Sequence, residues 1–168
     1  MVQKVPQKYV PNTLSKTDRK LQIVMLKQSR NNYKKGKYTS RKKLKSFKSK
    51  ISPHIIKAKK VYGVKEVKPS KNLAKATGCS IKGLKTIVGK GIGAYYSSGS
   101  RPSQTGHSWG YARLGSAITG GKSAIIDFHV LEKHCSPKSK AIKFAKKSKK
   151  IYKTSKKDNK KVSLKGGK

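Results

Sequence analysis

Acidic residues are scarce in this sequence: five aspartates and glutamates stand among 168 residues, against 44 lysines and arginines. The net charge is +39 at neutral pH. Because general acid–base catalysis relies largely on carboxyl and imidazole groups, so few acids argue against an enzyme. Charge repulsion of this size opposes compaction, so we expect the protein to act bound to DNA, RNA, an acidic protein surface or anionic lipid. The five acids are Asp18, Glu66, Asp127, Glu132 and Asp158.

Cysteine occurs only twice, at Cys79 and Cys135. Two cysteines do not make the disulfide framework of a small secreted domain, so we expect a reducing compartment. The cysteines and His107, His129 and His134 lack the paired spacing of a zinc site. We therefore expect neither a metal nor a cofactor.

Long apolar runs are also missing. No stretch of the sequence is apolar enough to span a bilayer, and the first residues, MVQKVPQKYVPNTL, lack the apolar core of a signal peptide. Only 33% of the residues are hydrophobic, which predicts a small core.

The positive charge is unevenly distributed. Residues 1–90 carry 26 basic and two acidic residues, and residues 136–168 carry 14 lysines and one acid. Residues 91–135 between them carry only four basic and two acidic residues and are rich in glycine, serine and aromatic residues. Because a lysine-rich segment builds a core poorly, we expect burial to concentrate in this near-neutral segment.

These shifts in charge predict three parts. Residues 1–66 form a basic helical arm, residues 67–135 a compact domain, and residues 136–168 a basic, flexible tail. Within the compact domain, residues 67–90 are helix-turn-helix-like and residues 91–135 form the near-neutral segment. The fold class is mainly α, with a small helical core and room for one short β element.

Helical patterns are present in both basic flanks. The spacing of Ser15 and Asp18 predicts a capping box that begins a helix ending at Gly36, and Ser52 with Pro53 predicts another that ends at Gly63. We expect the first helix to bury a stripe of Leu21, Val24, Met25 and Gln28. Leu44, Phe47 and Ile51 form a thin stripe among lysines. In the tail, we expect a helix that opens at Ser136-Pro137 and has a weak stripe of Ala141, Ile142, Ala145 and Tyr152, followed by a segment that is disordered until bound.

The segment NLAKATGCSIKGLKTIVGKG resembles the DNA-binding helix-turn-helix of repressor-type proteins. Ser70 caps a short helix through Ala76, Gly78 makes the turn, and Ser80 caps a second helix through Val88. The resemblance implies a recognition helix that presents Ser80, Ile81, Lys82, Lys85 and Thr86 to the major groove.

This segment departs from a groove-reading helix in two ways. Gly83 and Gly89 weaken the second helix, and no Asn, Gln or Arg is placed to read a base edge. Sequence-independent phosphate contact is the second interpretation, and a hairpin used only for packing is the third. The residues expected to contact phosphate are Lys75, Lys82, Lys85 and Lys90.

In the near-neutral segment we expect a helix from Ser108 to Gly120, with Tyr111, Leu114 and Ile118 on one stripe. The small residues Gly110, Ala112, Gly115 and Ala117 leave faces where another element can lie close, and Trp109 is expected in the core. SAIIDFHVL is predicted to be buried, as a strand or as a strand running into a helix capped by Asp127.

Two arginines stand where lysine is otherwise avoided. Arg101 and Arg113 either brace the loop through backbone carbonyls and Asp127, or hold an anion or nucleotide together with aromatic side chains. The aromatic candidates are Tyr95 and Tyr96, which can form a short strand or a stacking shelf, with Trp109 and Tyr111.

The block GKGIGAYYSSGSRPSQTGHSWGYARLGSAITGGKSAIID, with LAKATGCSIKGLKTIV before it, is similar to a domain of small, basic proteins of uncharacterised function from large DNA viruses of algae and amoebae. The resemblance covers about Pro69 to Asp127 and implies a protein of the virion or the viral factory.

Three functions follow in order of preference. The first is a non-enzymatic architectural protein of the virion, a minor capsid or core component, whose lysines contact DNA, an inner membrane or acidic capsid subunits, with no small-molecule substrate. It would lie in the virion and, in the host cell, in a cytoplasmic viral factory or the nucleus. The alternatives are a helix-turn-helix DNA-binding regulator and an enzyme acting on nucleic acid.

Overall fold

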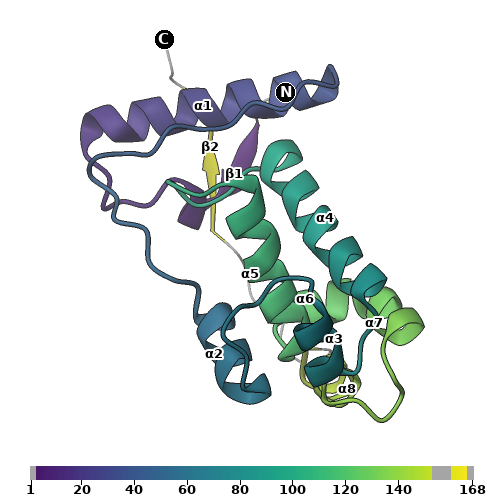
Figure 1. The fold of residues 1–168 in the computed structure, drawn as a ribbon. Coiled ribbons are helices and arrows are strands. Elements are labelled where there is room, and N and C mark those ends of the chain that lie inside the picture. Colours follow the sequence, from purple (N-terminus) through teal and green to yellow (C-terminus); the bar gives the residue numbers. More distant parts are fainter. Residues whose placement is uncertain (1–2, 153–159, 166–168) are drawn as a thin grey trace. The chain divides into compact units, whose positions relative to one another are not determined.

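The computed structural model describes residues 3–152 and 160–165 and is mainly helical, with one two-stranded sheet (Figure 1), so the predicted fold class is confirmed. A 3₁₀ turn at Gln7–Tyr9 follows the first strand. The helices are α1 (Lys16–Lys34), α2 (Pro53–Tyr62), α3 (Lys71–Thr77), α4 (Ile81–Ser97), α5 (Gly106–Ile118), α6 (Lys122–Ile126), α7 (Phe128–His134) and α8 (Lys140–Tyr152). The strands are β1 (Lys4–Pro6) and β2 (Lys161–Ser163).

The described residues pack as two compact units, each assembled from several segments of the chain. Unit 1 draws its residues from 1–50, 93–106 and 157–168, and unit 2 from 51–92 and 107–156. Helix α4 contributes residues to both. Each unit has its own cluster of buried apolar residues, so burial is not concentrated in the near-neutral segment as expected.

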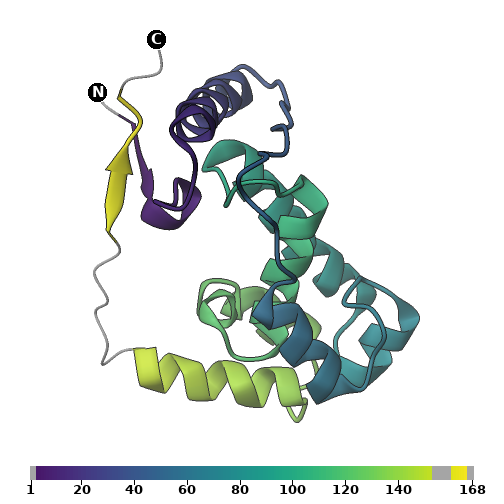
Figure 2. The same cartoon turned by 90° about the vertical axis from the view of Figure 1, so that its left-hand side faces the viewer.

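In unit 1, β1 and β2 lie side by side (Figure 2) and pair antiparallel. In this register Val5 is opposite Val162. Val5 and Leu164 are both buried. The expectation that residues after Tyr152 lack structure is therefore wrong for residues 160–165, because β1 supplies hydrogen-bond partners that the local sequence does not reveal. The remainder of that segment, residues 153–159 and 166–168, lies outside the described residues.

Helix α1 begins as predicted, and the Ser15 side chain accepts a hydrogen bond from the Asp18 backbone N–H. The predicted capping box is only half formed, because the Asp18 carboxylate accepts hydrogen bonds from Ser46 and the Ser15 N–H donates to Ser46 Oγ. The predicted stripe is wrong, however: Leu21 and Val24 are each 40% exposed. The helix instead buries a face that includes polar residues with hydrogen-bond partners of their own. Its buried residues are Gln22, Ile23, Met25, Leu26 and Ser29. Of the thin stripe that follows, Leu44 is buried, Phe47 is half-buried and Ile51 is exposed.

In unit 2, the ends of α2 follow the predicted local signals. Ser52 accepts a hydrogen bond from the His54 N–H, Pro53 occupies the first turn, and Gly63 ends the helix in the left-handed conformation at φ +62°. Helices α6, α7 and α8 pack on one another (Figure 2). Helix α8 begins at Lys140 rather than at Ser136-Pro137, because the Ser139 side chain accepts a hydrogen bond from the Ile142 N–H. It buries Ala141, Ile142 and Ala145 as expected, whereas Tyr152 is exposed.

Helix α4 does not end at Val88 but continues through three alternating glycines to Ser97. Packing requires a glycine at position 91, because a Cβ atom there would lie 2.6 Å from the Cα atom of Gly110 in α5. The small residues of α5 therefore permit the close approach that the sequence predicted. Gly115 likewise allows α5 to lie close to α2, since a Cβ atom at this position would lie 2.9 Å from the His54 carbonyl oxygen.

Two further expectations for the near-neutral segment are corrected. SAIIDFHVL forms no strand, because two short helices, α6 and α7, meet at Asp127, whose carboxylate makes no capping hydrogen bond. Helix α5 begins at Gly106, two residues before the predicted cap at Ser108. Its stripe is as predicted, with Leu114 and Ile118 fully buried and Tyr111 packed against them.

Cys79 and Cys135 are joined in a disulfide bond. The residue pair also forms an antiparallel β-bridge, which fastens the turn between α3 and α4 to the segment after α7. The sequence did not predict this pairing, because the fold brings together two cysteines that are 56 residues apart in the sequence.

Candidate nucleic-acid interface

The helix pair α3–α4 is formed by the local signals that the sequence predicted. Ser70 accepts a hydrogen bond from the Leu73 N–H at 3.1 Å, which caps α3. Gly78 ends α3 in the left-handed conformation at φ +71°, where a residue with a Cβ atom would be strained. Ser80 then accepts a hydrogen bond from the Gly83 N–H at 3.1 Å, at the start of α4.

Each of the two helices has one buried and one solvent-exposed face. Leu73, Leu84 and Ile87 are less than 2% exposed and anchor the pair in the core of unit 2. The opposite face is exposed and is rich in lysine, with a hydroxyl that is already hydrogen-bonded to the helix backbone. The exposed residues of this lysine face are Lys75, Lys82, Lys85 and Thr86.

The start of α4 contacts the last residue of α7, His134. The Ser80 N–H donates a hydrogen bond to the His134 carbonyl at 2.7 Å, and Ser80 Oγ lies 3.1 Å from His134 Nδ1. A Cβ atom on Gly83 would lie 2.3 Å from His134 Cβ, so this glycine makes the contact possible. Of the five predicted recognition residues, Ser80 is therefore held in this contact, Ile81 is half-buried, and the other three lie on the lysine face.

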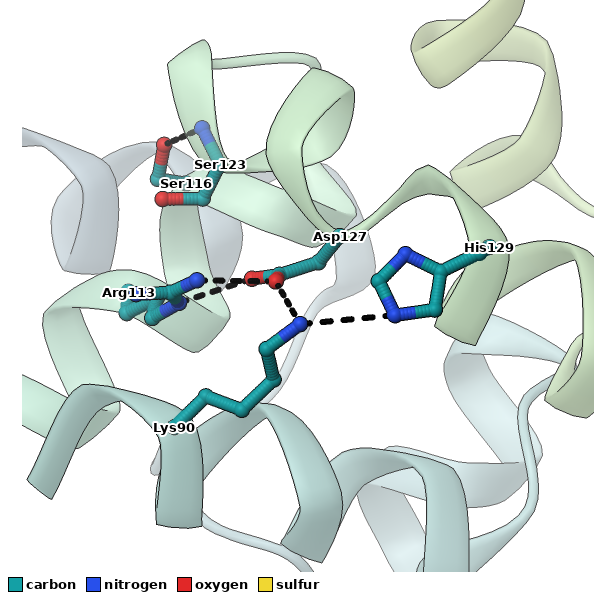
Figure 3. Close-up of polar contacts among 6 residues, drawn as sticks. All are labelled: Lys90, Arg113, Ser116, Ser123, Asp127 and His129. Atoms are coloured by element: carbon teal, nitrogen blue, oxygen red, sulfur yellow. Dashed lines mark hydrogen bonds and ion pairs between the residues drawn. The ribbon is translucent and has the colours of Figure 1, made fainter. Parts of the chain in front are cut away.

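Two of the predicted anion-binding cations lie against a buried carboxylate (Figure 3). The Asp127 side chain is 0% exposed and receives two hydrogen bonds from Arg113, Nε to Oδ2 at 2.7 Å and Nη2 to Oδ1 at 2.8 Å. Lys90 Nζ lies 2.9 Å from Asp127 Oδ1 and 3.4 Å from His129 Nε2. The predicted bracing of Arg113 by Asp127 is thus present.

The protonation of Asp127 is governed by this pair of cations. Burial alone would raise the pKa of the carboxyl group, but hydrogen bonds from Arg113 and Lys90, together with their positive charges, outweigh burial and hold the pKa below its ordinary value. Asp127 is therefore ionised at neutral pH and neutralises one of its two partners, so the cluster keeps a net positive charge.

Comparison with protein-family models gives a match over residues 6–130. The chain belongs to a family of unknown function (DUF5824). The region matched by DUF5824 includes α3, α4, α5 and Asp127, whereas α8 and β2 lie beyond it. Neither the curated proteins nor the solved structures gave a match to the chain.

The other predicted site residues of this DUF5824 protein are separated between the units. Arg101 is exposed in unit 1, whereas Arg113 lies in unit 2. Tyr95 is fully buried in unit 1, with its ring edge-on to Tyr96 at 4.8 Å between centroids. Both lie in the last turns of α4, not in a strand. Tyr111 is half-buried in α5 and packs against the core of unit 2. Trp109, which was expected in the core, is also only half-buried.

Arg41 is a buried cation that sequence reasoning missed. Its guanidinium donates hydrogen bonds to Ser29 Oγ at 2.8 Å, Tyr95 O at 3.0 Å and Ser100 Oγ at 2.9 Å, and lies 3.8 Å from the centroid of the Tyr95 ring. Burial lowers its pKa from the usual range. These partners fix the loop that follows α4 to α1, so the role of Arg41 is structural.

The described residues contain no group of three or more metal-ligating side chains. Among these same residues, no helix is both long and apolar enough to cross a bilayer.

Proposed function

We propose that this protein is a non-enzymatic architectural protein that binds DNA or another polyanion through its lysines. The observation that carries the proposal is the lysine face of α3 and α4. Lys75, Lys82 and Lys85 are exposed there on helices whose opposite faces are buried, in a chain with 39 more cations than anions. Exposed lysines on two anchored helices suit phosphate contact that does not depend on base sequence.

The setting of this function rests on the resemblance in the sequence. We propose a minor capsid or core component of a large DNA virus, located in the virion and, in the host cell, in a viral factory or the nucleus. Acidic capsid subunits and an anionic inner membrane are further partners of the same chemistry. The non-enzymatic role is supported by Asp127, a buried acid of the matched region that is already paired with Arg113 and Lys90.

The binding mode is tested with a 20-base-pair duplex of arbitrary sequence. Counterion release predicts that the logarithm of the binding constant falls linearly with the logarithm of salt concentration, with a slope set by the number of phosphate contacts. The double variant Lys82→Gln/Lys85→Gln should make this slope shallower by about 2. The control, Lys16→Gln/Lys20→Gln on exposed positions of α1, changes the same charge and should have a smaller effect. Equal effects of both pairs would contradict a role for the lysine face.

The second candidate is a helix-turn-helix regulator, which is favoured by the capped helices and the left-handed Gly78 between them. The architectural role is favoured because α4 carries no Asn, Gln or Arg that could read a base edge. A regulator should bind one duplex about 10³-fold or more tightly than random DNA. Selection from a random duplex library measures that ratio, and such a preference would replace the architectural proposal.

The virion setting is tested by mass spectrometry of purified particles separated into shell and DNA core. We expect the chain in one of these fractions. Abundance in infected-cell extract together with absence from washed particles would exclude the capsid role.

A further inference from the structure

A hollow of about 380 Å³ lies beside the lysine face, within unit 2. Its walls come from one face of α4, from the first turns of α5 and from the segment before α3. The hollow is shallow and open to solvent. The lining residues are Lys68, Pro69, Lys85, Val88, Gly89, Ile92, His107 and Tyr111.

The floor of the hollow is apolar and aromatic. Val88 is 7% exposed, and Ile92 and Tyr111 are half-buried and pack against the core. The His107 ring lies 6.1 Å from the Tyr111 ring between centroids. A flat ring placed here can stack on aromatic side chains, an interaction worth about 1–3 kcal/mol for a nucleobase.

The rim of the hollow is basic, and none of its lining residues is acidic. Lys68 and Lys85 are exposed, and Lys68 Nζ lies 5.9 Å from the centroid of the Tyr111 ring. Glu66 pairs with Lys68 at 3.5 Å, but both side chains are at least half exposed, so this ion pair is weak and can give way to a phosphate. The hollow thus combines an aromatic side chain, Tyr111, with the nearby ammonium group of Lys68 and an exposed lysine, Lys85.

We propose that this hollow binds a nucleotide, with the base on the floor beside Tyr111 and a phosphate at Lys68 and Lys85. The inference rests on the proposed function in taking a nucleic acid as the polyanion. The same chemistry is offered by a free mononucleotide and by an unpaired nucleotide of a strand. Lysines without a bidentate donor contact phosphate with little preference for sequence, so binding should tolerate any base.

Gly89 provides a test that leaves the fold intact. A Cβ atom on Gly89 meets nothing within 4 Å, although the residue lines the hollow, so a larger side chain there would occupy the space where the ligand lies. Gly93, on the same helix, also has open space around its Cβ position but does not line the hollow. Gly89→Leu is therefore the blocking variant and Gly93→Leu its matched control.

The experiment uses the full chain and measures dAMP binding by calorimetry. We expect Gly89→Leu to weaken dAMP binding at least tenfold and Gly93→Leu to change it less than twofold, with the helical circular dichroism of both unchanged. Inorganic phosphate should bind at least tenfold more weakly than dAMP. Should Gly89→Leu fail to fold, Lys68→Gln should weaken dAMP binding several-fold, against Lys71→Gln, an exposed lysine outside the hollow, as control.

A decadeoxyadenylate strand separates the two sources of the ligand. If Gly89→Leu weakens binding of the strand but not of dAMP, the ligand is an unpaired nucleotide of a strand. If it weakens binding of both, a free nucleotide is sufficient. Either outcome supports the proposal. Tighter binding of a phosphotyrosine peptide than of dAMP overturns it. If the wild-type chain does not bind duplex DNA, the proposed function is overturned. If it binds duplex DNA but Gly89→Leu changes the binding of neither dAMP nor the strand, only the nucleotide site is overturned.

Discussion

Gly83 and Gly89 occupy the same helix, yet substitution by alanine should have opposite effects on stability. Gly83→Ala forces a Cβ atom to within 2.3 Å of His134 Cβ, and overpacking of this kind costs about 1–3 kcal/mol. Gly89→Ala meets no atom and should stabilise α4 by about 1 kcal/mol. Urea denaturation of the two variants measures both changes. Effects of the same sign would contradict the packing of α4 against the end of α7.

Asp127→Asn should be among the most damaging single substitutions in unit 2. It leaves Arg113 and Lys90 beside a neutral side chain, and removal of one partner from a fully buried ion pair costs about 3–5 kcal/mol. Because the side chains of Arg113 and Lys90 are 19% and 35% exposed, we expect a cost at or below the lower end of this range. Glu132→Gln, which removes an exposed acid, should change the free energy of unfolding by less than about 0.5 kcal/mol. Chemical denaturation at neutral pH compares the two variants.

The stability that Asp127 contributes should depend on pH in the acid range. Because its pKa is lower in the folded than in the unfolded chain, the contribution is fully present above the unfolded value of about 3.9 and is lost as the pH falls through the folded pKa. The free energy of unfolding is measured for the wild type and for Asp127→Asn from pH 6 to pH 2.5. The difference between the two proteins at each pH gives the contribution of Asp127. A difference that stays constant over this range would contradict the depressed pKa.

Residue-level signals predicted the helix ends well because capping is local. Ser52, Ser70, Gly63 and Gly78 all act on neighbours within a few positions, which the sequence displays directly. The buried position of Arg41 could not be predicted in this way. Its backbone N–H donates to the Tyr95 hydroxyl, 54 residues further along the chain, and no local pattern distinguishes it from the exposed basic residues around it.

Among the elements, the disulfide is expected to be the strongest single constraint on unit 2. Cross-linking cysteines 56 residues apart restricts the unfolded chain by about 4 kcal/mol in the chain-entropy model. Reduction should therefore lower the thermal midpoint of the wild type. The variant Cys79→Ser/Cys135→Ser should melt near the reduced wild type and show no response to reductant. Equal midpoints for oxidised and reduced wild type would contradict a stabilising bond.

Element boundaries and faces were predicted less well where tertiary contacts decide them. The apolar pattern gave the wrong face of α1 because Gln22 and Ser29 are buried through hydrogen bonds to Tyr9 and Thr39, which a hydrophobic stripe does not register. Helix α4 runs past its glycines because Gly91 packs directly against Gly110. At the candidate site, the lysine face was visible in the sequence, whereas the hollow beside it depends on the approach of α4, α5 and the segment before α3.

At the scale of the whole molecule, charge repulsion should make stability rise with ionic strength. Salt screens the repulsion among 39 excess cations, so the thermal midpoint should be higher in 0.5 M than in 0.02 M sodium chloride. Heparin at low salt should raise it as well, because a polyanion that binds the folded chain stabilises it by mass action. An uncharged polymer such as dextran is the control. A midpoint that falls with salt would show that attractive ion pairs outweigh the repulsion.

The pairing of β1 with β2 also bears on the order in which the chain acquires its structure. Pro6 and Lys161 meet in one ladder, although nearly the whole sequence separates them. During translation, the first strand emerges long before its partner exists, and Val5 has no completed ladder to join until Ser163 has left the ribosome. Unit 1 must therefore finish folding after synthesis of that strand, while the segments of unit 2 up to Tyr152 are free to fold earlier.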